Sequence, residues 1–387
     1  HDRARAYYVR RLPQTHGGEQ QRLLFDYVFL HRDNPLFKPF IDWQETGTSL
    51  PTPAGEADWP VLAEMVERHE GAESARLARH WFARQPQGVM VFRGTHHEPL
   101  GFLLVLRLEE AGEEERAADP ATRAAWEWLA RHAPLRRGER ATHFRFWMAR
   151  DAYQAVSATQ SMAFLKVTQH YLTTPGLAFT FFPLADEAFW SPFFLHVDLF
   201  RVPGADFAVG GRRYAVFGHD WRAVPPMLWL DVLARRELDT TPPEGGAAPA
   251  GAPAGERAAV LGEAEFAAAV QEALKCFARP RELRRSPLLR TRLVLREAGV
   301  EAAEAERVPV LQALLRRAAE PLRASPRQRR WWDALHHGCF EPAASQERAA
   351  QRLYVSFSTF RRHLKAGVDH VAETLWQWEL GAGDEKS

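Results

Sequence analysis

Cysteine is scarce in this 387-residue chain, which contains only Cys276 and Cys339. Two cysteines exclude a disulfide scaffold and a cysteine zinc site, and their scarcity is typical of proteins that work in a reducing compartment. The sequence also lacks a signal peptide and any apolar run near the roughly 20 residues that a membrane-spanning helix needs. We therefore expect a cytoplasmic protein that does not associate with a membrane.

A strong excess of one charge is missing as well. The chain has 50 Lys and Arg residues and 49 Asp and Glu residues, which gives a net charge of +1. Any nucleic-acid site must therefore be a local patch. The 24 Phe and 13 Trp residues allow a large buried core, and the length predicts two or three domains. Because the first residue is His1 rather than Met, we expect a piece of a longer protein.

Familiar catalytic and metal-binding motifs are also absent. The sequence has no Gly-x-Ser-x-Gly elbow, no Walker loop and no dinucleotide-binding fingerprint. His96 and His97 are adjacent in an expected hairpin, where neighbouring side chains point to opposite faces. His336, His337 and Cys339 lack the spacing and the second ligand pair of a zinc site. The sequence predicts no metal centre.

The first half of the chain alternates helix-like and strand-like segments. Asp58 followed by Trp59-Pro60 is typical of a helix start, and Gly210-Gly211 is typical of a hairpin turn. This order predicts an α/β domain, a mixed sheet flanked by helices. The expected elements are helices over 61–68 and 72–84, a hairpin of 89–92 and 101–108, a strand over 143–148, a helix from 160, a strand over 177–182, a helix over 186–199 and a hairpin over 206–217.

The second half is predicted to be helical throughout. A Pro-, Gly- and Ala-rich stretch separates it from the α/β domain and predicts a flexible linker. The chain therefore divides into five expected parts. These are a connecting helical segment (1–43), the α/β domain (44–238), the linker (239–257), a helical region (258–324) and a helix-turn-helix domain (325–387).

The stretch from His143 to Tyr171 is expected to be a strand, a tight polar turn and a helix. Such a turn directs the free N–H groups of the helix toward an anion such as phosphate. The order of elements around it resembles the GNAT (Gcn5-related N-acyltransferase) fold. The resemblance implies that acetyl-CoA lies between two splayed strands, with its pyrophosphate at the turn. The residues that match the cofactor-binding turn are Gln154, Ser157, Ala158, Thr159 and Gln160.

Two departures from the GNAT pattern bear on activity. Ser157 and Thr159 replace the two glycines that let the family's backbone approach the phosphate. Phe194 stands about where the family often has a proton-donating Tyr, and His196 or Tyr214 would have to substitute for it. We therefore expect a non-catalytic GNAT-like domain. An active acetyl-CoA-dependent N-acyltransferase and an unrelated α/β domain are the alternatives.

A helix is expected to open at Ser325 and to end at Gly338. After it, the end of the chain contains a short helix, a turn and a longer helix. Ser345 is expected to cap the first helix, the turn is Tyr354-Val355-Ser356, and the second helix starts at Phe357 or Ser358. This layout resembles the region-four helix-turn-helix of sigma factors. The resemblance implies that the start of the second helix enters the major groove of duplex DNA. The residues placed there are Ser356, Ser358, Thr359, Arg361, Arg362, His363 and Lys365.

Taken together, these features predict a bacterial regulator of transcription. The layout is similar to the C-terminal part of large bacterial regulators that carry an upstream ATP-binding module. In this interpretation, a GNAT-like domain is coupled to a helix-turn-helix that binds DNA. Such a helix pair also serves as a protein-interaction module, so a protein partner is the alternative for this end of the chain.

Overall fold

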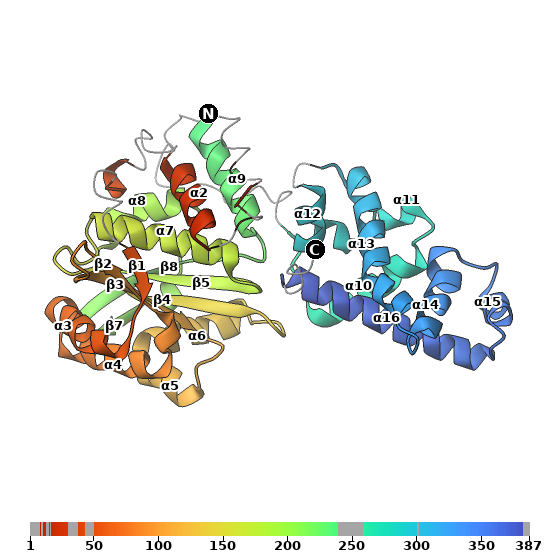
Figure 1. Ribbon diagram of the computed structural model, residues 1–387, viewed down its shortest axis with the longest axis horizontal. Helices are drawn as coiled ribbons and strands as arrows, with labels where there is room; N and C mark the ends of the chain where they lie inside the picture. Colours follow the sequence, from red (N-terminus) through yellow and green to blue (C-terminus); the bar gives the residue numbers. More distant parts are fainter. Residues whose placement is uncertain are drawn as a thin grey trace. The chain divides into compact units, whose positions relative to one another are not determined.

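The chain folds into two compact units. The computed structural model describes residues 8, 11–12, 15, 17–29, 38–42, 50–238, 258–299 and 302–381. The first unit, here called the α/β unit, takes residues up to 135, 139–221 and 226–252. The second, the helical unit, takes 136–138, 222–225 and the residues from 253 onward (Figure 1). The expected linker at 239–257 lies outside the described residues.

A mixed sheet forms the centre of the α/β unit. Its strands follow the order β1-β2-β3-β4-β5-β8-β6, with β7 paired to β8. β4 and β5 are parallel, whereas the other pairs are antiparallel. The strands are β1 (Leu50–Pro53), β2 (Val89–Arg93), β3 (Pro99–Arg107), β4 (Arg140–Ala149), β5 (Leu177–Leu184), β6 (Phe200–Arg201), β7 (Phe207–Val209) and β8 (Arg212–Asp220).

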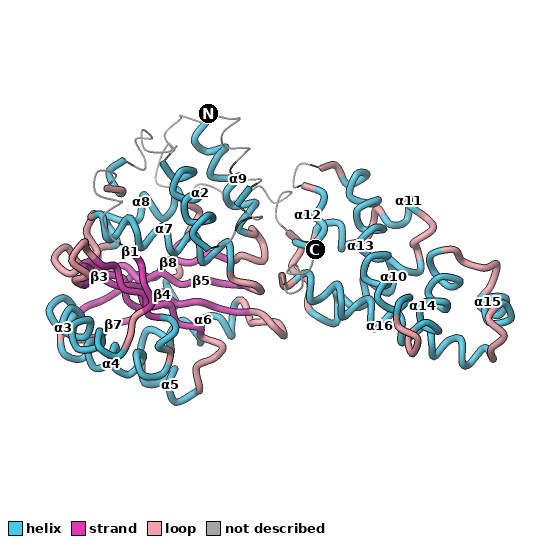
Figure 2. The backbone as a smooth tube through the Cα atoms, in the orientation of Figure 1, coloured by secondary structure: helices cyan, strands magenta, loops and turns pink. Residues whose placement is uncertain are grey.

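Helices cover both faces of this sheet (Figure 2). One face carries α3 (Trp59–Glu70), α4 (Ala72–Arg84), α5 (Glu113–Ala118) and α6 (Pro120–His132). The other carries α2 (Gly17–Phe29), α7 (Ala158–Thr173), α8 (Glu187–His196) and α9 (Pro226–Leu238). Short helical turns occur at η2 (Lys38–Phe40), η3 (Glu56–Asp58), η4 (Pro86–Gly88) and η5 (Pro203–Ala205).

The sequence predictions for this unit are confirmed at the level of elements. The helix expected over 72–84 has those bounds in α4, and both expected hairpins are present. Asp119 caps α6 by accepting a hydrogen bond from the N–H of Ala121. The turn glycines Gly210 and Gly211 have φ of 59° and 78°, a region in which a Cβ atom is strained.

The helical unit has one continuous hydrophobic core. Buried side chains from Phe266 to Leu380 belong to the same cluster, so the two helical regions expected separately pack as one body. The helices are α10 (Glu263–Lys275), α11 (Pro280–Leu283), η6 (Pro287–Arg290), α12 (Arg292–Ala298), α13 (Glu304–Ala324), α14 (Arg329–Leu335), the π-helix η7 (His336–Phe340), α15 (Gln346–Arg352) and α16 (Phe357–Glu379). No helix within the described residues is long and apolar enough to cross a membrane.

Two details of this unit differ from expectation. The helix expected to open at Ser325 begins at Arg329, because the four residues before it form a turn closed by the Ser325 carbonyl. Gly338 was expected to end this helix, but it lies inside the π-helix η7. A Cβ atom on Gly338 would come within 3.1 Å of Leu364 in α16. The glycine therefore serves close packing rather than helix termination.

Candidate functional sites

In the turn after β4, two side chains form hydrogen bonds with backbone N–H groups at the start of α7. Ser157 is the N-cap and accepts from the N–H of Gln160 at 3.1 Å. The side chain of Gln160 accepts in return from the N–H of Ser157 at 3.5 Å. This capping box occupies two of the N–H groups that a phosphate would use. Ala158, at the first helical position, is half-buried.

The other residues expected to hold a cofactor are buried. Gln154 is only 5% exposed, and its Oε1 accepts from the N–H of Ala185 at 2.9 Å. Gln154 thus fastens the turn to the segment that follows β5. Thr159 packs toward β3, where a Cβ atom on Gly101 would lie 2.7 Å from the Thr159 methyl group. Of the five predicted residues, Ser157 and Ala158 remain half-buried, and Gln154, Thr159 and Gln160 face the interior.

The parallel strands β4 and β5 separate near the same turn. Their pairing ends at His143 and Phe181, although β4 continues to Ala149 and β5 to Leu184. Trp147 lies in this gap, and its indole N–H donates to the Pro183 carbonyl at 2.8 Å. Its ring contacts three further aromatic side chains at centroid distances of 5.1 to 5.8 Å. These rings belong to Phe164, Phe182 and Trp190. Side chains of the protein itself therefore fill the gap.

Phe194, at the position of the family's proton donor, and Tyr214, one of its two possible substitutes, lie on different faces of the sheet. Phe194 is buried against Phe182, at a centroid distance of 5.0 Å, on the side of α7 and α8. Tyr214 belongs to the hydrophobic cluster on the side of α6 and stacks on Phe207 at 4.8 Å. Burial, followed by the charge of Glu70, raises the pKa of Tyr214 above its usual range. Tyr214 therefore keeps its proton and does not face the gap occupied by Trp147.

A buried ion pair, which the sequence did not predict, lies on the α3–α6 side of the sheet. The Nε of Arg145 donates to Asp119 Oδ2 at 2.8 Å, and the indole of Trp81 donates to the same oxygen at 2.8 Å. Burial alone would raise the pKa of Asp119, but the Arg145 guanidinium holds it below its usual range. Glu70 lies 4.0 Å from Arg145 and accepts from the Tyr153 hydroxyl at 2.9 Å.

Several polar atoms of this cluster have no hydrogen-bond partner within the described part of the chain. They include Nη1 and Nη2 of Arg145 and Oε2 of Glu70. His143 has neither ring nitrogen bonded, and burial, followed by the Arg145 charge, lowers its pKa to about 3. Buried polar groups without partners are rare in folded proteins. A single Arg within the aromatic run HFRFWM was the one sequence signal of this cluster.

A second candidate site is the surface formed by α15, the turn and the start of α16. Ser345 caps α15, and Ser356 caps α16 by accepting from the N–H of Thr359 at 3.2 Å. The two helices pack through a small core that includes Ala349, Ala350 and Phe360. The expected short helix, turn and long helix are therefore present. Tyr354 occupies the turn at a φ of 54°.

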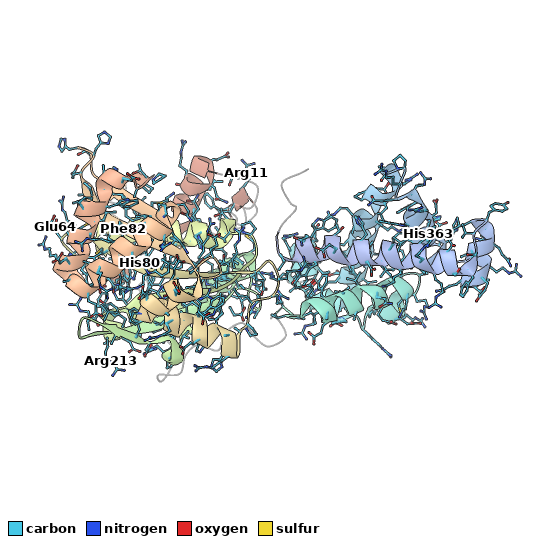
Figure 3. The ribbon with its side chains drawn as sticks, turned by 90° about the horizontal axis from the view of Figure 1, so that it is seen from below. Arg11, Glu64, His80, Phe82, Arg213 and His363 are labelled. Carbon is cyan, nitrogen blue, oxygen red and sulfur yellow. The ribbon has the colours of Figure 1, made fainter. Side chains whose placement is uncertain are left out.

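The residues expected to contact DNA form an open, cationic surface. Ser356, Ser358, Arg361, Arg362 and Lys365 are exposed, and Thr359 and His363 are half-buried (Figure 3 marks His363 on α16). None of the three cations has a carboxylate partner among the residues that the structure describes. Partial burial lowers the pKa of His363, and the charges of Arg330 and Arg362 lower it further. The surface is therefore locally positive.

Neither candidate site contains an evident metal centre. In the described ranges, no group of three or more His, Cys, Asp and Glu side chains is arranged to hold a metal ion. No protein-family model matches the chain, and no curated protein matches it.

Proposed function

We propose that this protein is a regulator that binds duplex DNA through α15, the turn and the start of α16. The observation that carries the proposal is the set of exposed cations Arg361, Arg362 and Lys365, none of which has a carboxylate partner among the described residues. Residues 346–366 contain five Arg and Lys residues and one acidic residue, whereas the whole chain is nearly neutral. A local positive patch on a nearly neutral protein is what a DNA contact surface requires.

The spacing of these side chains suits the major groove. Ser358 lies three and four residues before Arg361 and Arg362, and Lys365 lies four and three residues after them, so the four side chains share one face of α16. Arg can bond to guanine edges, and Ser and Lys can bond to phosphates. The positive end of the helix dipole at Ser356 adds to the attraction for phosphate.

The α/β unit enters this proposal as a non-catalytic GNAT-like domain. Its strand order and its single parallel pair, β4 and β5, support the GNAT-like part. The position of Trp147 in the gap and the burial of Gln154 and Thr159 support the non-catalytic part, because these side chains already contact the protein itself. Under this proposal the unit organises the protein or contacts partners rather than transferring an acyl group.

DNA binding is tested by titrating a fluorescent duplex with the full chain and measuring anisotropy at two salt concentrations. We expect binding that weakens steeply as salt rises, because contacts to phosphates release counterions. Binding to protein partners alone would leave the duplex anisotropy unchanged at both salt concentrations. That outcome would replace the DNA-binding proposal with the protein-interaction alternative.

An active acetyl-CoA-dependent N-acyltransferase is the second candidate. The unpartnered atoms of Arg145 and Glu70 and the raised pKa of Tyr214 favour it, since unsatisfied buried polar groups and shifted pKa values occur often at catalytic sites. Calorimetric titration with acetyl-CoA separates the two proposals for this unit. Micromolar binding of acetyl-CoA would reject the non-catalytic assignment, and no detectable heat would support it.

A further inference from the structure

A cavity of about 430 Å³ lies in the helical unit, between α13 and the continuous segment of α14 and η7. This volume falls within the roughly 300–1,000 Å³ that is typical of small-molecule sites. Three arginines, two carboxylates and three aromatic rings line the cavity. None of these residues belongs to the proposed DNA-binding surface, so the cavity is a separate feature of the unit.

The cavity carries guanidinium groups that an anion can engage. Arg316 has no carboxylate partner in the described ranges, and its guanidinium lies 5.1 Å from the centre of the Phe277 ring. Arg323 and Arg329 pair with acidic residues of their own helices, at 3.3 and 3.4 Å. Exposed pairs of this kind contribute little, so a phosphate can displace the carboxylates.

The rings of Trp332, His336 and Phe340, here called the aromatic wall, line the same cavity as these guanidinium groups. The ring of Trp332 stacks on His336 at 6.0 Å with an angle of 21° and packs against Phe340 at 5.7 Å. The guanidinium of Arg323 lies 5.9 Å from the Trp332 ring centre. Trp332 is half-buried, so part of it remains open to a ligand. Such a wall can stack a planar ring while the neighbouring arginines hold an anionic group.

The backbone at this cavity is unusual. His336 and Phe340 are the first and last residues of the π-helix η7, and both line the cavity. π-Helical turns are rare and occur frequently at functional sites. Both rings pack against Trp332. The π-turn is therefore a second observation, independent of charge, that points to a ligand.

We propose that this cavity binds a nucleotide, with its base against Trp332 and its phosphates among Arg316, Arg323 and Arg329. The side chains of Glu320 and Asp333, freed from their arginines, accept hydrogen bonds from the ribose hydroxyls or from an amino group of the base. Only a ligand that carries both a planar ring and a phosphate group can contact Trp332 and the arginines at the same time. Adenosine alone and inorganic phosphate alone each engage one part of it.

The test is calorimetric titration of the full chain, without DNA, with ADP, adenosine and inorganic phosphate. We expect ADP to bind at least about tenfold more tightly than either fragment. The exposed substitutions Arg316→Gln and Arg323→Gln should each weaken ADP binding severalfold. The matched control is Arg281→Gln. Arg281 is an exposed arginine of α11 that does not line the cavity and has no carboxylate partner in the described residues, so its substitution should leave ADP binding unchanged.

Two results would overturn the proposal. Absence of heat with ADP up to ~1 mM would show that the cavity is not a nucleotide site. Phosphate binding as tightly as ADP would show an anion site that does not use the aromatic wall. Because no DNA is present, a negative result here leaves the DNA-binding proposal untouched, and failure of DNA binding does not affect this measurement.

Discussion

Replacing the three exposed cations of α16 should change the salt dependence of DNA binding. The perturbation is the triple substitution Arg361→Ala, Arg362→Ala and Lys365→Ala. All three side chains are exposed and lack carboxylate partners among the described residues, so their removal leaves no buried charge behind. Exposed substitutions of this kind usually change stability by less than about 0.5 kcal/mol. The folded helical unit should therefore survive the change.

The magnitude follows from counterion release. Each phosphate neutralised by a cation contributes about −0.9 to the slope of log affinity against log salt concentration. If all three cations contact phosphates, the triple variant should have a slope shallower by about 2.7. Between 50 and 200 mM salt, the loss of affinity should then be smaller by roughly 40-fold than for the original protein. Its affinity at low salt should be reduced for every DNA sequence.

The assay is fluorescence anisotropy with one duplex at several salt concentrations, and its control removes the same charge elsewhere. Arg281, Arg284 and Arg285 are exposed arginines of the α11 region without carboxylate partners in the described residues. Their triple substitution to Ala should leave the slope close to that of the original protein. Equal slopes for the two triple variants would refute the assignment, because DNA would then respond only to net charge.

Three further predictions concern stability. Replacing Arg145 by Met leaves the Asp119 carboxylate buried without its charge partner. The free energy of unfolding, measured by urea titration, should therefore fall by about 3–5 kcal/mol. A loss below about 1 kcal/mol would show that the fold does not depend on this ion pair. Tyr354 has a φ of 54°, where a side chain strains the backbone, so replacing it by Gly should raise the free energy of unfolding by about 1 kcal/mol and raise the melting temperature accordingly. Tyr354→Ala is the matched control, because alanine keeps the Cβ atom and therefore the strain. The pKa of His143 is about 3 in the folded protein and near 6.5 in the unfolded chain. Between pH 6.5 and about pH 3 the unfolded state therefore binds more protons, and the free energy of unfolding falls as the pH drops through this range. In His143→Leu that pH dependence should be weaker, by up to about 1.4 kcal/mol per pH unit, and an unchanged slope would contradict the assignment.

Local patterns predicted the elements well. The helix at Ala72–Arg84 was placed correctly because Pro86 and Gly88 end the helical pattern directly after it. The N-cap Ser345 could be recognised because a cap depends on residues within one turn. The coarse architecture, an α/β unit and then a helical unit, followed from this order of elements.

Contacts between distant residues could not be predicted in the same way. Arg145 pairs with Asp119 and approaches Glu70, which lie 26 and 75 positions away in the sequence, and no local pattern connects them. A register shift between β3 and β4, at Leu104 and Val105, accompanies this arrangement. Such a bulge redirects one side chain and leaves little trace in the alternation of apolar residues. The nucleotide cavity was missed for the same reason, since α13 and η7 supply its walls separately.

One glycine in each unit, Gly101 and Gly338, allows close packing next to a candidate ligand site. At the turn before α7, side chains occupy the positions where the GNAT pattern has glycines, and the missing Cβ atom is instead at Gly101, which makes room for Thr159. The space that Gly101 leaves is filled by the Thr159 side chain, so no phosphate can approach the backbone of the turn there. At Gly338 the missing Cβ atom lets η7 approach α16, while the opposite side of the π-turn faces an open cavity. Small-molecule binding therefore fits the helical unit better than the α/β turn that the sequence first suggested.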